Sequence, residues 1–227
     1  MTVFRQLKKT YSFKSVKWKY PNKILRRRLA RTELVTDVQK YFNTVEHYAW
    51  PNSPWYTGVG LHSNAHCLLQ PLAKQLCGNH GNRVDYQDSL NYHQLLVQDL
   101  LPSFGSFTAV RSKIASFDAG SMVVNVNTWH KDETPFEVLR MVVPIVSEPA
   151  YLFQMDNQQP CWLEPGYVYA FDQSQYHRVL VQSPCRQPRL HLILSLVTWF
   201  TRSNDQWQPN EFCGKTHPLE LFEAVEI

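Results

Sequence analysis

The pattern of apolar residues changes between the two halves of the chain. Residues 24–43 place Leu25, Leu29, Leu34, Val38 and Phe42 near helical spacing, which predicts an amphipathic helix. Segments 64–77 and 86–101 also predict helices, because residues 78–82 form a polar, glycine-containing break and Pro102 ends the second segment. Residues 50–55 contain two prolines and predict a loop. The N-terminal half is therefore predicted to be mainly helical.

From Phe107 onward, short apolar runs separated by turn residues indicate strands. The predicted strands are 108–117, 122–129, 138–146, 150–155, 168–171, 177–182 and 189–199, with a turn at 118–121. Their number and spacing suit an antiparallel sandwich or barrel. We therefore predict an α+β fold in which N-terminal helices buttress one face of a β-sandwich.

The same change of pattern suggests how the chain is organised. Residues 1–106 would form a basic arm and a helical support region, 107–200 the β-core, and 201–227 a C-terminal extension. The simplest organisation of these parts is one structural domain. At 227 residues with 44% hydrophobic content, the chain is long enough to bury a sizeable core.

Composition narrows the class of protein. The chain has no apolar run long enough to span a membrane, and its N-terminus lacks the apolar core of a secretory signal. The five cysteines are odd in number and include no CxxC pair. We expect reduced thiols in a cytoplasmic protein, and neither a disulfide framework nor a zinc site.

Charge is concentrated at the N-terminus. Residues 1–31 contain eleven Lys and Arg and no Asp or Glu, which leaves a net charge of −7 on the rest of the chain. Such an arm could contact nucleic acid, an anionic membrane or an acidic partner, and it loosely resembles a transit peptide. Aromatic residues between its lysines favour a simpler interpretation, in which the arm is folded against the body as a scaffold element.

The candidate chemistry lies in three residues of the β-region. His130 and Asp132 follow a predicted strand, and His177 begins a later one. Two histidines and one carboxylate on one face of a barrel form the ligand set of a non-haem Fe(II) oxygenase. Taken singly, each residue could be structural, and a metal-free sandwich with incidental histidines stays open. His62 and His66 have helical i, i+4 spacing but no evident third ligand.

An arginine lies on the next predicted strand, at position 189. Residues 189, 191, 193 and 195 of a strand face the same way, so His191 and Ser195 would lie beside Arg189. Guanidinium suits a dicarboxylate ligand because it binds carboxylate in a bidentate manner. Arg186, in a proline-flanked loop, is the rival anchor. His191 could equally be a hydrogen-bonded core histidine.

The order of these elements resembles the aspartyl/asparaginyl β-hydroxylase-like branch of the Fe(II)/2-oxoglutarate dioxygenases. The resemblance covers about residues 111–197. A Gly-containing turn at 119–121 precedes His130-x-Asp132, and a Leu139–Arg140 pair follows it. A Pro-Gly-x-x-x-x-Phe-Asp segment at 165–172 then leads to His177, and Arg189 stands in an Arg-Leu-His-Leu-Ile strand.

This resemblance implies a double-stranded β-helix, the jelly-roll barrel of cupins. It implies Fe(II) held by His130, Asp132 and His177, with O2 and 2-oxoglutarate as co-substrates. Arg189, with His191 and Ser195, would bind 2-oxoglutarate. Arg140 has the family's position for contact with an anionic group of the co-substrate or the substrate, and a structural salt bridge is its alternative.

The expected reaction is hydroxylation of an unactivated C–H bond in a small amino-acid-like substrate, coupled to decarboxylation of 2-oxoglutarate to succinate. Hydroxylation of a protein side chain is the alternative activity. A non-catalytic metal-binding barrel that serves as a partner-binding module is an alternative of another class. A nucleic-acid partner is not expected, and a homodimer stays open.

Overall fold

The computed structural model describes ten segments of the chain. They are residues 16–19, 22–29, 33–44, 48–50, 53–60, 107–109, 112–117, 128–182, 185–203 and 206–224. The predicted helices at 64–77 and 86–101, the pair His62 and His66, and most of the predicted strand at 122–129 lie outside these residues. Residues 128 and 129, at the end of that strand prediction, are not in a strand.

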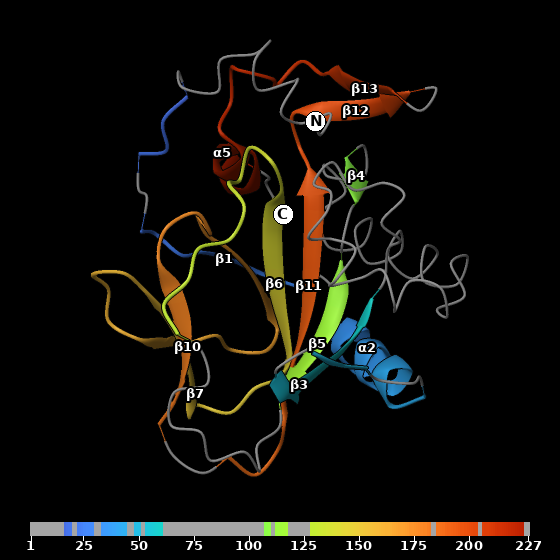
Figure 1. Cartoon of the computed structure of the whole chain (residues 1–227), viewed down its shortest axis with the longest axis vertical. Coiled ribbons are helices and arrows are strands. Elements are labelled where there is room, and N and C mark those ends of the chain that lie inside the picture. Colours follow the sequence, from blue (N-terminus) through green and yellow to red (C-terminus); the bar gives the residue numbers. More distant parts are fainter. Residues whose placement is uncertain are drawn as a thin grey trace.

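A large antiparallel sheet forms the centre of the molecule (Figure 1). Its strands run in the order β1-β9-β6-β11-β5-β3-β2, and β4 pairs with β11. The bounds are β1 Leu25–Arg28, β2 Tyr48–Trp50, β3 Ser53–Gly60, β4 Thr108–Ala109, β5 Lys113–Phe117, β6 Leu139–Val146, β9 Tyr167–Ala170 and β11 Arg189–Val197. The long and largely apolar strand β11 lies between β5 and β6.

A second, three-stranded sheet lies on one side of the large one (Figure 1). It has the order β10-β7-β8, with β7 at Tyr151–Met155, β8 at Cys161–Trp162 and β10 at His177–Val181. Val142 and Tyr169 of the large sheet share one buried cluster with Phe153, Met155 and Val179 of the small sheet. The two sheets therefore pack against each other through apolar side chains. We call the side of the large sheet that faces the small one its inner face.

Two helices supply apolar side chains to the outer face of the large sheet. Helix α2 (Glu33–Thr44) buries Leu34, Val38 and Phe42, and Figure 1 shows it on the side away from β7 and β10. Helix α5 (Pro218–Ala224) adds Leu219 and Phe222 to the same core cluster. The apolar residues of α2 recur every four positions, so they lie on one side of the helix.

The predicted helix at 24–43 is correct only in its second half. Residues Leu25–Arg28 form β1, an edge strand that pairs antiparallel with β9. Leu25 and Leu29 are both buried, and their spacing of four fits one face of a strand as well as one face of a helix. Pairing with β9 supplies hydrogen-bond partners to the backbone of these residues, so they form a strand and not a helix. The fold is thus mainly antiparallel sheet, and α2 is the one N-terminal helix among the described residues.

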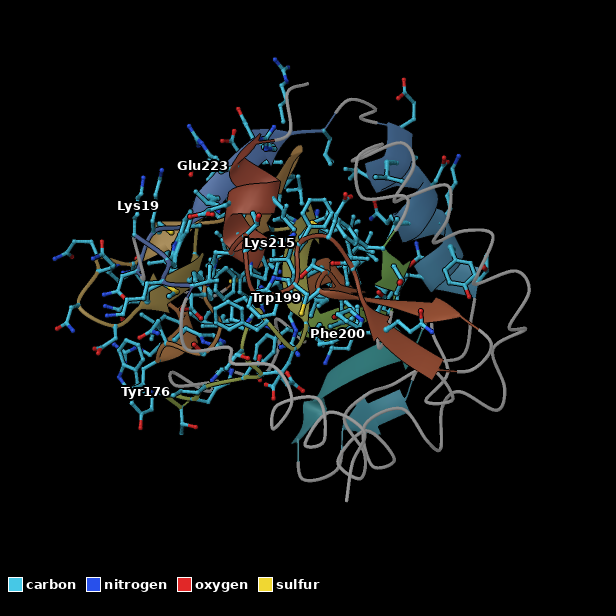
Figure 2. The ribbon with its side chains drawn as sticks, turned by 90° about the horizontal axis from the view of Figure 1, so that it is seen from above. Lys19, Tyr176, Trp199, Phe200, Lys215 and Glu223 are labelled. Atoms are coloured by element: carbon cyan, nitrogen blue, oxygen red, sulfur yellow. The ribbon has the colours of Figure 1, made fainter. Side chains whose placement is uncertain are left out.

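The basic arm is packed against the body at least at Trp18. This side chain is 9% exposed and stacks on His217, with ring centroids 5.4 Å apart. Near it, the hairpin of β12 (Phe200–Ser203) and β13 (Gln206–Pro209) follows Trp199, whose indole N–H donates to the carbonyl of Thr216. Trp199 and Phe200 are fully buried and lie among the densely packed side chains in Figure 2. The C-terminal residues therefore complete the core.

No helix within the described segments is both long and apolar enough to cross a membrane.

Candidate metal centre

The backbones of the two candidate histidines are hydrogen-bonded to each other. His130 and His177 form an isolated antiparallel bridge, in which each N–H donates to the other's carbonyl at 3.1 and 3.0 Å. Two residues on, the N–H of Asp132 donates to the carbonyl of Gln173 at 2.9 Å. Residues 128–133, which we call the ligand arm, are thereby fixed alongside the start of β10.

Hydrogen bonds also orient both imidazole rings. Nδ1 of His130 lies 3.0 Å from the carbonyl oxygen of Thr128, and Nδ1 of His177 lies 3.0 Å from that of Gln175. A carbonyl only accepts, so in the neutral form of each ring Nδ1 carries the proton and Nε2 keeps its lone pair. Fixing of the tautomer by a backbone carbonyl is typical of metal-binding histidines.

The ligand atoms of His130, Asp132 and His177 converge. One such atom from each residue lies within 4.8 Å of the others, and no other described His, Cys, Asp or Glu residues form such a group. Nε2 of His177 is 3.8 Å from Oδ2 of Asp132, and the two imidazole centroids are 4.3 Å apart. Two imidazoles and a carboxylate in this arrangement fit a divalent metal with open coordination positions.

Asp132 is held in its charged form by its neighbours. Oδ2 accepts a hydrogen bond from Nη1 of Arg140, whose Nη2 also donates to Oε2 of Glu133 at 2.9 Å. Burial raises the pKa of Asp132, but Arg140, then His177, His130 and Lys113, outweigh it and lower the pKa overall. The carboxylate is therefore ionised at neutral pH, as a metal ligand must be.

His177 is kept neutral by its surroundings. Its ring packs near Phe171 and Phe153, at centroid distances of 5.4 and 5.8 Å. Burial lowers its pKa, and the opposing effects of the Gln175 carbonyl and Asp132 are too small to reverse this. Its Nε2 therefore stays unprotonated and available to a metal at pH values somewhat below the usual pKa of histidine.

Arg189 and His191 contact each other on the inner face of the large sheet. Nε of Arg189 donates to Nε2 of His191 at 3.0 Å, and Nη2 lies 2.8 Å from Nδ1. His191 is only 2% exposed, and burial followed by the Arg189 charge lowers its pKa well below the usual value. His191 is therefore neutral at neutral pH.

The buried state of His191 makes folding stability depend on pH. The unfolded chain binds a proton at His191 below about pH 6.5, whereas the folded chain does not, so stability should fall as pH drops below that value. We expect His191 to contribute a loss of about 1.4 kcal/mol of unfolding free energy per pH unit. Urea unfolding at pH 7.5, 6.5 and 5.5 should show a steeper loss for the natural chain than for His191→Asn. Equal slopes would contradict this origin.

Ser195 and Arg186 occupy different surroundings. Ser195 is 2% exposed, and its backbone pairs with Arg140 across β11 and β6, which places both side chains on the inner face. Arg186 is exposed in the loop before β11, where its N–H and that of Gln187 donate to Oε1 of Glu148. Arg189 lies in β11 and contacts His191 on the inner face, whereas Arg186 lies in the exposed loop.

The outer side of the histidine bridge carries two aromatic rings covered by cations. Arg178 lies over Trp129 and Lys131 over Tyr176, each 4.3 Å from the ring centroid. Each pair joins residues directly opposite across the bridge. Figure 2 shows Tyr176 at the edge of the molecule, and its side chain is 48% exposed. These residues alternate with the histidines, so they face away from the metal ligands.

Three residues near the centre were not singled out from the sequence. Glu133 shares Arg140 with Asp132, and Gln173 binds the ligand arm through its carbonyl while its Nε2 donates to the carbonyl of Val138. Lys113, on β5, pairs with Ile193 and lies near enough to lower the pKa of Asp132.

Comparison with known proteins gives structural likenesses only. No family model matches the chain, and no curated protein matches it. Among solved structures, the chain resembles the non-haem alpha-ketoglutarate-dependent epimerase SnoN from nogalamycin biosynthesis. The TM-score is 0.49 at 13% identity, over 80% of this chain and 81% of the other.

Two further likenesses have similar scores. A Pseudomonas putida prolyl-4-hydroxylase matches with TM-score 0.43 and 11% identity, over 77% of this chain and 92% of the other. The dioxygenase for auxin oxidation 1 from Arabidopsis thaliana, solved with 2-oxoglutarate, matches with TM-score 0.44 and 13% identity, over 85% and 88%. At such scores the activities of these proteins cannot be transferred to this chain, so its chemistry has to be inferred from its own residues.

Proposed function

We propose that this chain is an Fe(II)- and 2-oxoglutarate-dependent dioxygenase that hydroxylates a C–H bond of a small amino-acid-like molecule. The observation that carries the proposal is the convergence of His130, Asp132 and His177 within 4.8 Å, with both Nδ1 atoms bound to backbone carbonyls. Two histidines and one carboxylate with open positions are the ligand set of non-haem Fe(II) oxygenases. With 2-oxoglutarate and O2, the bound iron would supply the oxidising power for C–H hydroxylation.

The position of Arg189 fits a role in binding the far carboxylate of 2-oxoglutarate. Arg189 pairs with Phe117, whose ring contacts Tyr151 at the end of β7 opposite to Met155, the partner of His177. Those ends of β7 are four residues, or about 13 Å, apart along the strand. A long dicarboxylate and an extended arginine side chain suit such a span, with His191 and Ser195 on the same face of β11.

The packing between the sheets would keep water from this region. Phe153, Phe171 and Tyr169 belong to the buried cluster on the inner side, and Phe153 and Phe171 contact His177. A dry surrounding strengthens the attraction between a guanidinium and a carboxylate. The protein would thus bind and orient 2-oxoglutarate and limit the access of solvent to it.

A substrate carboxylate is proposed on the basis of Arg140. Its Nε is buried and has no hydrogen-bond acceptor among the described residues. A buried donor without an acceptor is costly, so a substrate whose binding moved this side chain enough to bring an oxygen to Nε would be stabilised there. This favours an amino-acid-like substrate. Hydroxylation of a protein side chain and a non-catalytic partner-binding barrel are the competing proposals.

Turnover against a panel of free amino acids and short peptides tests these proposals. The purified chain, with Fe(II), 2-oxoglutarate and ascorbate under air, should yield succinate together with a product heavier by one oxygen. Success with free amino acids and not with peptides supports the small-molecule substrate. Turnover of peptides alone favours the protein hydroxylase. Tight Fe(II) binding without any succinate favours the partner-binding module.

A further inference from the structure

Arg140 connects the candidate metal ligand to a second acid. Its two Nη atoms bind consecutive residues, Asp132 through Oδ2 and Glu133 through Oε2. The side chains are 14% exposed for Arg140, 28% for Asp132 and 20% for Glu133. A partly buried, two-sided contact of this kind is stronger than an exposed ion pair, because solvent screens it less.

The chain path between these residues explains how the contact forms. After the ligand arm, Glu137 accepts hydrogen bonds from the N–H and hydroxyl of Thr134 at 3.0 and 3.2 Å. The N–H groups of Glu137 and Val138 both donate back to the carbonyl of Thr134. This turn reverses the chain into β6, whose second residue is Arg140. The guanidinium therefore extends from the large sheet to the ligand arm.

We propose that Arg140 is a positioning residue that fixes Asp132 for metal binding, with Glu133 as its second attachment point. The inference rests on the proposed metal centre and adds residues that are not ligands. Without Glu133, the guanidinium could rotate about Asp132. With both acids bound, its planar fork restricts the ligand arm in two directions. Lysine could not reproduce this, since its ammonium group lacks the fork.

Outer-sphere partners of metal ligands typically change metal affinity by 10- to 100-fold when removed. We therefore expect Arg140→Ala to weaken Co(II) and Fe(II) binding to the chain, without 2-oxoglutarate, by about 10- to 100-fold. Arg140→Lys should lose most of the same affinity. Glu133→Ala should weaken binding less, and Glu133→Gln, which can still accept a hydrogen bond, should recover part of that loss.

Arg178→Ala is the matched control. Arg178 is also close to the centre and hydrogen-bonded, to Oε1 of Gln154, but it lies on the opposite side of the histidine bridge. Its removal should leave metal affinity within about 2-fold of the natural chain, well below the effect of an outer-sphere partner. The visible spectrum of bound Co(II) should change in Arg140→Ala and stay the same in Arg178→Ala, because only the former alters the position of a ligand.

The outcomes are distinct. If the natural chain binds neither metal, the proposed function fails. If it binds metal and Arg140→Ala binds equally or more tightly, the positioning role is wrong while the metal centre stands. An additive effect of Glu133→Ala on top of Arg140→Ala would also contradict it, since partners in one contact should show coupling in a double-mutant cycle. Thermal unfolding of each variant identifies any that fail to fold.

Discussion

Replacing His130 or His177 by alanine is expected to abolish Fe(II) binding and succinate formation together. Each histidine offers one Nε2 to the proposed metal, and removing one of three protein ligands leaves too few to hold it. His130 is half-buried, so its replacement should cost little stability. Binding can be measured by titrating the metal-free chain anaerobically, and folding by circular dichroism.

Tyr176→Ala is the control for this experiment. Tyr176 is adjacent to His177 in sequence but faces outward, with its ring beside Lys131. It should therefore retain metal binding. Undiminished Fe(II) affinity in His130→Ala and His177→Ala, in chains that fold, would eliminate the proposed centre.

Replacing Arg189 by lysine is expected to weaken 2-oxoglutarate binding by roughly 1.5–3 kcal/mol, or about 10- to 150-fold, with metal binding unchanged. Lysine keeps the charge but loses the second N–H of the bidentate contact. Lysine has a single side-chain nitrogen, which cannot contact both ring nitrogens of His191 as Nε and Nη2 of Arg189 do. Titration of 2-oxoglutarate into the metal-loaded chain gives the affinity directly.

Arg186→Ala is the matched comparison for the anchor. Arg186 is exposed and its loop is bound through backbone N–H groups to Glu148, so its side chain can be removed with little structural change. It should not alter the affinity for 2-oxoglutarate. A loss in Arg186→Ala together with normal binding in Arg189→Lys would show that the anchor had been assigned to the wrong arginine.

The elements predicted correctly from the sequence are those whose residue pattern is compatible with only one type of secondary structure. The strands at 139–146, 151–155, 167–170, 177–181 and 189–197 follow the predictions within one or two residues. The helix prediction was wrong over Leu25–Arg28, because two leucines four residues apart fit either periodicity. Pairing with β9, which joins residues far apart in sequence, could not be read from the local pattern.

Some features of the candidate site could likewise be predicted from the sequence, and others could not. The proximity of His130, Asp132 and His177 was predicted from their order and their strand contexts, and their ligand atoms lie together. The partners of Arg140 could not be predicted, because they depend on a reversal at Thr134–Glu137 whose geometry the sequence does not specify. The backbone carbonyls that orient the histidines were equally inaccessible, since every residue carries one.

The backbone bridge between His130 and His177 bears on the order of assembly. Residues 131–176 form a loop whose ends must meet before both imidazoles can share an ion, and closing such a loop costs conformational entropy. Here the strand-like pairing and the packing of two sheets close it. The metal would then bind to a preformed pair and need not fold the chain around itself, in contrast to a zinc finger. Chelation should accordingly remove the ion and leave the loop closed, so the centre could be emptied and refilled without unfolding.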